Sequence, residues 1–178
     1  MLTSIRKKIG YKSLDRQIGH SSRVRASKAF DEIKKINLVG EGDLETFERV
    51  KKQLNSILSL SKKEIQWIWY FPQKEEIDPI EKTLSFNAKE VDLFFRLKSS
   101  IESELSKVDG EVSICLNFDP SLVLLNTIAR INSPMKVGIS GVYDALFDLM
   151  LNIPEDSKLE YYLEQIFALL KVMNKQKV

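Results

Sequence analysis

Short apolar runs alternate with amphipathic segments along most of this chain. Nearly continuous apolar runs of roughly four to eight residues are typical of strands buried on both faces, whereas apolar residues spaced three or four apart indicate helices. The run EIQWIWYF at 64–71, which is rich in aromatic and β-branched residues and is stopped by Pro72, is the strongest strand prediction. The expected strands cover residues 36–40, 64–71, 112–118, 135–139 and 146–153.

Helices are expected between these strands. In the segment that follows the first strand, Leu44, Phe47, Val50 and Leu54 fall on one helical face, and Asp43 is a suitable N-cap. The remaining helices are predicted from similar spacing and from prolines near their ends. The expected helices of this part of the chain cover residues 44–58, 91–95, 99–107, 122–132 and 157–175.

This alternation predicts an α/β fold, a three-layer Rossmann-like arrangement with a mostly parallel sheet of about five strands. Too few residues separate the strands at 135–139 and 146–153 for a helical crossover, so we expect the last strand to be an antiparallel edge. We expect one α/β domain at 31–178, preceded by a basic, partly helical N-terminal leader at 1–30.

Composition places the chain among ordinary globular proteins. Of its 178 residues 43% are hydrophobic and 29% charged. No apolar run approaches the roughly 18 residues of a membrane-spanning helix, and no signal peptide is evident. The single cysteine, Cys115, lies in an apolar run, so it is expected to be a buried thiol in a cytoplasmic protein.

Charge is distributed unevenly. Residues 1–35 hold ten Lys or Arg against three Asp or Glu and therefore carry +7, which leaves −5 on residues 36–178 of a chain whose net charge is +2. Apolar residues of the leader have helical spacing, but Gly10 and Gly19 interrupt it, which favours a short or frayed helix. A second helix is expected at about 23–34.

Basic residues mixed with isolated Leu and Ile fit an anionic membrane surface or the phosphates of a nucleic acid. A solvated arm without a partner, or an arm that docks on the acidic remainder of the chain, would have the same composition. The candidate contacts with an anionic surface are Arg6, Lys7, Lys8, Lys12, Arg16, Arg23 and Arg25.

A second candidate site is the carboxyl edge of the sheet, where open α/β proteins bind ligands. The turn Gly40-Glu41-Gly42-Asp43 joins a strand to a helix, as phosphate-binding loops do, and Asp119 and Ser121 follow another strand. The third glycine of a dinucleotide fingerprint and the Lys-Ser/Thr of a P-loop are both absent, and the carboxylates would repel a phosphate. The ligand-binding candidates here are Gly40, Gly42, Asp43, Asp119 and Ser121.

Catalytic and metal chemistry has little support in the sequence. Oxygen ligands at this edge would suit magnesium, but Asp43 and Asp119 are also explained as residues at helix N-termini. One histidine, His20, and one cysteine provide neither a nucleophilic triad nor a zinc site. We therefore expect no metal and no cofactor. Trp67 and Trp69 share a strand face, which suits either a stacking platform or, as we expect, core packing.

The order of basic leader, INLVGEGD, EVSICLNFD, ARINSPMKVGI, FDLMLNI and LEYYLEQIFALLK resembles an uncharacterised bacterial family, a domain of unknown function found mainly in Bacteroidota. Residues 112–141 also resemble a strand–helix–strand unit of heptosyltransferase-type glycosyltransferases. That likeness implies one Rossmann-like half, whereas those enzymes enclose a sugar nucleotide between two such domains.

Together these patterns favour a non-catalytic binding or accessory domain whose cationic leader contacts an anionic surface, either a membrane or a nucleic acid. Binding to a membrane would place the cytoplasmic protein at the periphery of the inner membrane. The alternative is a small enzyme or ligand-binding protein that acts on a nucleotide or phosphosugar at the carboxyl edge of the sheet.

Overall fold

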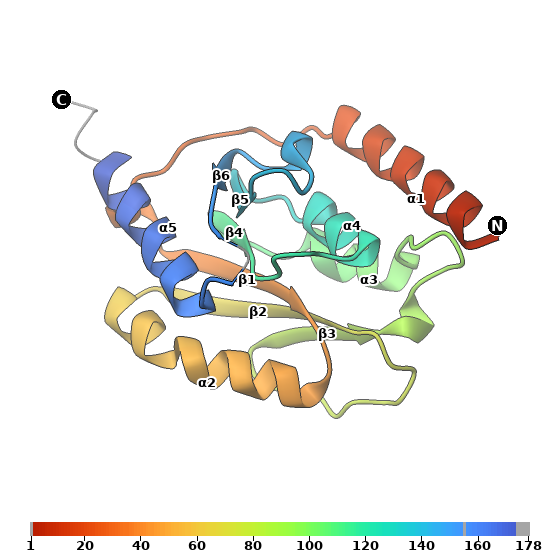
Figure 1. Ribbon diagram of the computed structural model, residues 1–178, viewed down its shortest axis with the longest axis horizontal. Coiled ribbons are helices and arrows are strands. Elements are labelled where there is room, and N and C mark those ends of the chain that lie inside the picture. Colours follow the sequence, from red (N-terminus) through yellow and green to blue (C-terminus); the bar gives the residue numbers. More distant parts are fainter. Residues whose placement is uncertain (1, 155, 174–178) are drawn as a thin grey trace.

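A six-stranded, entirely parallel sheet forms the centre of the molecule (Figure 1). The structure is a computed structural model that describes residues 2–154 and 156–173. In spatial order the strands are β3-β2-β1-β4-β5-β6, so the order runs outward in both directions from the neighbours β1 and β4. The strands are β1 (Lys35–Glu41), β2 (Glu64–Phe71), β3 (Thr83–Asn87), β4 (Val112–Cys115), β5 (Met135–Ile139) and β6 (Leu149–Leu151).

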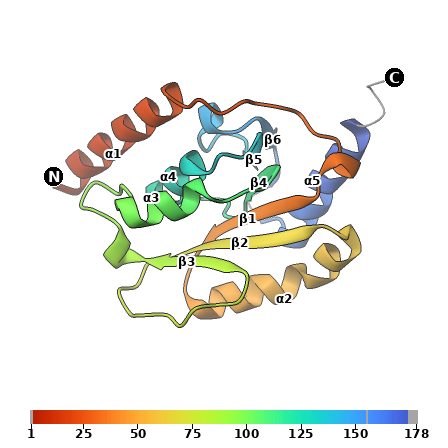
Figure 2. The same ribbon diagram turned by 180° about the vertical axis from the view of Figure 1, so that it is seen from behind.

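Helices cover both faces of this sheet (Figures 1 and 2). One face is covered by α2 (Leu44–Ser61) and α5 (Leu159–Met173), and the other by α3 (Ser99–Ser106) and α4 (Leu122–Arg130). A fifth helix, α1 (Leu2–Gly19), packs on α4 rather than on the sheet itself. Three short 3-10 helices lie in the connections, at Phe30–Glu32, Ala88–Glu90 and Asp144–Leu146.

Each face of the sheet has its own apolar core. Beneath α2, the rings of Trp67, Trp69 and Phe71 all contact Phe47 edge-on, so the tryptophans pack in the core, as expected from their shared strand face. The second core lies beneath α4 and includes Cys115, which is 2% exposed. This burial confirms the expected buried cysteine, and it raises the pKa of the thiol to about 12.

The N-terminal helix is held closely against α4. Leu14 is fully buried at this contact, and Gly10 lies so near α4 that a Cβ there would be 2.5 Å from a Leu122 methyl carbon and 2.7 Å from the Phe94 carbonyl oxygen. After α1, the extended chain crosses to β1, and Arg23 fastens it to Asp148 and to the carbonyl oxygens of Ser133 and Pro134. The structure therefore shows no separate basic leader among the described residues.

The expected α/β fold with a mostly parallel sheet is correct, but the expectation of an antiparallel edge is wrong. Strand β6 pairs with β5 in parallel, through Val137–Leu149, Gly138–Met150 and Ile139–Leu151. A connection of residues 140–148, with a single 3-10 turn in place of an α-helix, is long enough for the crossover because β6 is only three residues long. The sheet also has six strands instead of about five.

Other expected elements differ locally from the structure. Residues 2–19 form one continuous helix despite Gly10, because burial against α4 compensates for the low helix propensity of glycine. Residues 23–34 have no regular secondary structure apart from the 3-10 turn at Phe30–Glu32, and 91–95 form a turn in place of a helix. Strand β3 was not predicted because TLSFN alternates polar and apolar residues over only five positions. The helix expected at 157–175 is α5, and residues 174 and 175 lie outside the described residues.

The contact at Gly10 gives a testable expectation for the stability of the fold. Gly10→Ala should lower the free energy of unfolding by about 1–3 kcal/mol, because the added methyl group overpacks the contact with Leu122 and Phe94. Gly19→Ala is the matched control, since a Cβ at this position of the same helix meets nothing within 4 Å. Urea denaturation with amide hydrogen exchange of α1 measures both variants. Equal effects of the two substitutions would show that α1 is not docked as described.

Candidate functional site

At the carboxyl edge of the sheet, side chains of the protein fill the position where β1 and β4 end. In this type of sheet, that position usually binds ligands. The Glu41 carboxylate accepts hydrogen bonds from the backbone N–H of Ser121, at 2.6 Å, and from the Ser121 hydroxyl. The Asn117 side-chain amide accepts a 3.0 Å hydrogen bond from the Glu41 N–H and donates a 3.3 Å hydrogen bond to the Glu41 carbonyl oxygen. Glu41 thus holds the first turn of α4 in the place where a ligand phosphate would otherwise bind.

The second helix that starts at this edge is capped in the same way. Asp43 accepts a 2.8 Å hydrogen bond from the Thr46 N–H at the start of α2, and this bonding lowers the pKa of Asp43. The pKa of Glu41 is raised, because burial outweighs its bonds from Ser121. Two of the chain's own carboxylates therefore occupy the helix N-termini that could attract an anion.

The glycines of this turn serve internal packing. A Cβ at Gly40 would lie 2.3 Å from the Trp69 ring, and the carbonyl oxygen of Gly42 accepts a 3.1 Å hydrogen bond from the Trp69 indole N–H. Asp119 is exposed next to Ser121. The five residues predicted to bind a ligand therefore lie at one edge of the sheet, as expected. Gly40 and Gly42, however, contact the Trp69 side chain. Within residues 2–154 and 156–173, no three His, Cys, Asp or Glu side chains are placed to hold a metal ion together.

Basic side chains from the N-terminal part of the chain line a cavity of about 470 Å³ between the ends of α1 and α4. We call this cavity the basic pocket. It is lined by Arg16, His20, Arg23 and Arg130, together with Gln17 and several serines, and no carboxylate belongs to its lining. Arg16 and Arg23 were predicted as anion contacts. Arg130 was not, because it lies over a hundred residues later in the sequence, and only the docking of α1 brings it near the other two.

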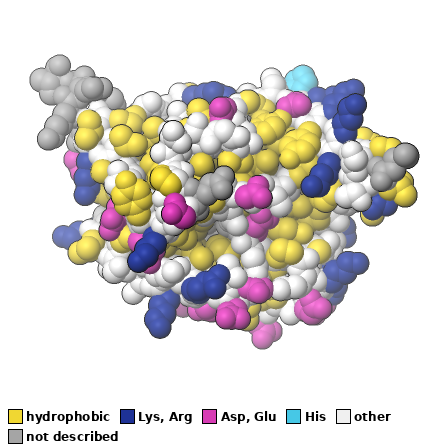
Figure 3. Space-filling model, viewed as in Figure 1, with side chains coloured by type: hydrophobic (Ala, Val, Ile, Leu, Met, Phe, Trp, Pro, Cys, Tyr) yellow, Lys and Arg dark blue, Asp and Glu magenta, His cyan; other side chains and the backbone are white. Residues whose placement is uncertain are grey.

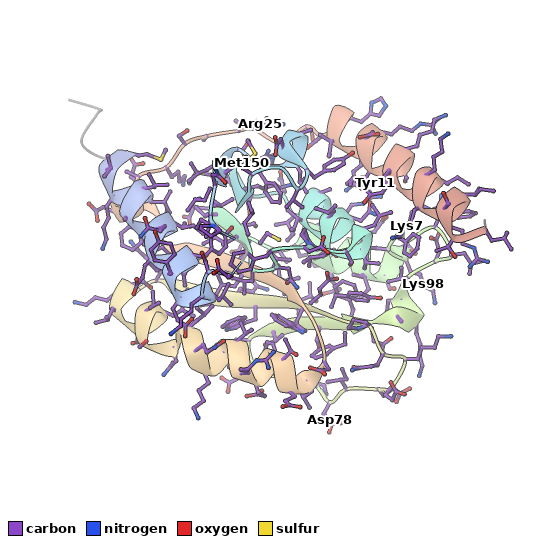
Figure 4. The ribbon with its side chains drawn as sticks, in the orientation of Figure 1. Lys7, Tyr11, Arg25, Asp78, Lys98 and Met150 are labelled. Atoms are coloured by element: carbon purple, nitrogen blue, oxygen red, sulfur yellow. The ribbon has the colours of Figure 1, made fainter. Side chains whose placement is uncertain are left out.

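A buried lysine lies next to the basic pocket. Lys136, the second residue of β5, is 2% exposed, and its ammonium group donates to the carbonyl oxygen of Ala129 at 3.1 Å. Burial, followed by repulsion from Arg23, lowers the pKa of Lys136 to about 7, although Asp148 opposes the shift. A small cavity of about 40 Å³ joins Lys136 to Arg23 and Arg25. Figure 4 shows Arg25 on the segment that crosses above β6.

The outward side of α1 carries the other basic residues. Residues 2, 5, 9, 12 and 16 follow one another at intervals of three and four, and so form one stripe along the helix. Its first half is Leu2, Ile5 and Ile9, which are 72%, 53% and 42% exposed, and its second half is Lys12 and Arg16. Figure 3 shows hydrophobic and basic side chains next to one another at the end of the molecule where α1 lies. We call these five residues the outer stripe.

The remaining basic candidates lie around the outer stripe. Lys8 is exposed beside it, Lys7 is exposed, and Arg6 is half-buried. Figure 4 shows Lys7 and Tyr11 on α1 with Lys98 close to them in the projection. The Tyr11 ring stacks on Tyr143, with centroids 6.1 Å apart, and the Tyr143 hydroxyl donates to Asp15. The structure thus divides the predicted cations between the outer surface of α1 and the basic pocket at its C-terminal end.

The titration of Lys136 can be observed through stability. Between its pKa of about 7 in the fold and the ordinary 10.5, the unfolded chain binds more protons than the folded one. The free energy of unfolding of the natural protein should therefore rise with pH relative to Lys136→Met, by about 2–5 kcal/mol across this window. Urea denaturation of both proteins at pH 6.5 to 10.5 tests this, because other groups cancel in the difference. A pH-independent difference would contradict it.

Comparison with known proteins adds the family of the chain but no activity. No curated protein matches the chain, and no solved structure matches it. A family model described as "Family of unknown function (DUF6913)" matches residues 6–173, which include nearly all of α1 and the whole sheet. The chain therefore belongs to this family of unknown function.

Proposed function

We propose that this protein is a non-catalytic binding module that attaches to an anionic membrane surface through the outer stripe of α1. The observation that supports the proposal is the exposure of Leu2, Ile5 and Ile9 in line with Lys12 and Arg16. These three aliphatic side chains on one helical stripe are not covered by any described part of the chain. A helix that presents both aliphatic and basic side chains suits the boundary between lipid headgroups and acyl chains.

The expected energies favour reversible attachment. Full burial of one Leu or Ile side chain contributes about 1.5–3 kcal/mol, and each cation near an anionic leaflet contributes about 1 kcal/mol. A few such contributions give weak binding that depends on both the apolar and the basic residues. None of the helices in the described part of the chain is long and apolar enough to cross a bilayer. The proposed attachment is therefore peripheral.

A nucleic acid is a poorer match for the same surface. Single-stranded binding sites use aromatic rings for base stacking, and duplex binding uses Lys, Arg and polar side chains on phosphates. The outer stripe presents aliphatic side chains in its first half, which have no favourable contact with a phosphate backbone. The carboxyl edge also gives little support for a phosphosugar or nucleotide site, because Glu41 and Asp43 occupy the donors there.

The apolar half of the stripe can be tested with vesicles. Ile5→Glu/Ile9→Glu should abolish sedimentation of the full chain with vesicles of equimolar phosphatidylcholine and phosphatidylserine, because buried apolar area is lost and two anions are added. The matched control is Leu60→Glu/Val172→Glu, at positions that are 83% and 55% exposed on α2 and α5. Circular dichroism confirms folding of each variant. Absence of binding by the natural chain, or equal losses in both variants, would refute the proposal.

The basic residues require a separate measurement. Lys8→Glu/Lys12→Glu should weaken binding to the same vesicles by about thirtyfold or more, because about 1 kcal/mol per lost cation is involved. Lys52→Glu/Lys74→Glu makes the same change in net charge at exposed positions away from α1, and should bind nearly normally. Pure phosphatidylcholine vesicles should bind little, and added salt should weaken binding. Insensitivity to both salt and lipid charge would contradict an electrostatic contribution.

A further inference from the structure

We propose that the basic pocket is a binding site for a hydroxylated phosphomonoester. The inference does not depend on membrane attachment, because the pocket lies at the C-terminal end of α1 and shares only Arg16 with the outer stripe, whereas the exposed aliphatic residues lie in the N-terminal half. Its volume of about 470 Å³ falls within the range of small-molecule sites.

The lining of the pocket selects for negative charge. Three arginines and the only histidine of the chain border it without a carboxylate. Guanidinium groups bind phosphate oxygens through paired, charge-assisted hydrogen bonds, and Ser13, Ser21 and Ser22 add hydroxyl groups that suit the same oxygens. Lys136 and Arg25 lie behind the Arg23 wall, where Asp148 pairs with both arginines.

The arginines have different tasks within the pocket. Arg23 is already bound to Asp148 and to two carbonyl oxygens, so it forms a fixed wall. Arg130 pairs with Glu102 at 2.6 Å, with both side chains about one-third exposed. Arg16 is exposed and forms no ion pair among the described residues. The guanidinium groups of Arg16 and, at the rim of the pocket, of Arg130 are therefore the ones available to a ligand.

Neutralisation of helix ends does not explain these cations. Both α1 and α4 end at the pocket, and the carbonyl ends of helices attract positive charge. The backbone carbonyl oxygens there already accept hydrogen bonds. The Arg16 oxygen accepts from the backbone N–H of His20, and the Ile18 oxygen accepts from that of Ser21. The Ala129 oxygen accepts from the Lys136 ammonium group. The Arg16 guanidinium and the His20 ring are not used by any of these bonds.

Gln17 indicates that the ligand carries hydroxyl groups. Gln17 is one of the residues that line the pocket, and its amide oxygen is buried without a hydrogen-bond partner among the described residues. An unpaired buried acceptor is costly, and a ligand hydroxyl would satisfy it. A phosphate group for the arginines and a hydroxyl group for Gln17 together describe a sugar phosphate, a nucleotide or a phosphorylated lipid headgroup.

Calorimetry with glucose 6-phosphate, inorganic phosphate and glucose as probes tests this site on the full chain. Glucose 6-phosphate should bind saturably and more tightly than inorganic phosphate, and glucose should not bind. Arg16→Gln/Arg130→Gln should weaken binding by about tenfold or more, because two charge-assisted contacts are lost. Arg16→Lys/Arg130→Lys, which keeps the charge but not the paired geometry, should bind with intermediate affinity.

The control variant is Arg49→Gln/Arg96→Gln. Arg49 is exposed and forms no ion pair within 4.0 Å in the described part of the chain, as for Arg16, and Arg96 pairs with Asp92 as Arg130 pairs with Glu102. This variant should bind glucose 6-phosphate normally. Thermal unfolding of each variant separates loss of the site from loss of the fold.

Vesicles distinguish the two sources of the ligand. If phosphatidic acid, whose headgroup is a phosphomonoester, is preferred over phosphatidylserine in equally charged vesicles, and Arg16→Gln/Arg130→Gln removes this preference, the site binds a lipid headgroup. Because Arg16 also belongs to the outer stripe, the same variant should weaken binding to both kinds of vesicle by about the contribution of one cation. Saturable binding of glucose 6-phosphate that the same variant weakens supports a soluble ligand. Absence of both results, or binding that the arginine variants do not change, overturns the inference, whereas vesicle binding through Ile5 and Ile9 would be unaffected.

Discussion

Helix α4 is apolar on nearly every side, and its complete burial is the constraint on which the rest of the structure depends. Every residue from Leu122 to Ala129 is buried. A helix of this kind needs cover on the side away from the sheet as well, and α1 and α3 provide it. The two buried polar residues of α4 are satisfied internally, since Asn126 donates to the carbonyl oxygens of Phe95 and Leu122, and Thr127 donates to that of Val123.

The docking of α1 explains both candidate surfaces. Only the stripe that contains Gly10, Leu14 and Ile18 faces the protein, so the stripe on the other side of the helix remains exposed. The helix has two apolar stripes on different sides, which is why it does not look like a simple amphipathic helix in the sequence. Docking also brings the ends of α1 and α4 together, and this juxtaposition places Arg16 beside Arg130.

Much of the fold could be predicted from hydrophobic patterns, because burial on both sides of a parallel sheet leaves a strong local signal. The predictions at 64–71 and 135–139 agree with β2 and β5 at both ends. The same patterns carry no information about strand direction, and β6 was expected to be antiparallel because too few residues precede it for a helical crossover. The last strands show that a short strand can be reached by a parallel crossover without an α-helix.

The candidate site was harder to predict than the fold. The cations of the N-terminal region were visible as a group, but their separation into a stripe and a pocket depends on contacts with residues near 130. One signal was available, because LVLLNTIA is apolar all round and such a helix requires a covering element. The N-terminal helical pattern had not been assigned to a face of the sheet and was a candidate for this cover. Lys136 could not be identified from the sequence, because MKVGI resembles a strand with one exposed lysine.

The positions of the charged residues at the two edges of the sheet give the strongest reason to place an anion site away from the carboxyl edge. Glu41 and Asp43 lie where β1 ends, at the carboxyl edge, whereas Lys136 is near the start of β5, at the amino edge, and the basic pocket adjoins it. Because the strands are parallel, these two charged regions are on opposite edges of the same sheet. At the carboxyl edge, the carboxylates already hold the helix N-termini. At the amino edge, Asp148 and Glu111 pair with basic side chains, and Arg16 of the basic pocket forms no ion pair among the described residues. The fold therefore keeps a familiar sheet, and the anion site that we propose lies at the edge opposite to the usual ligand position.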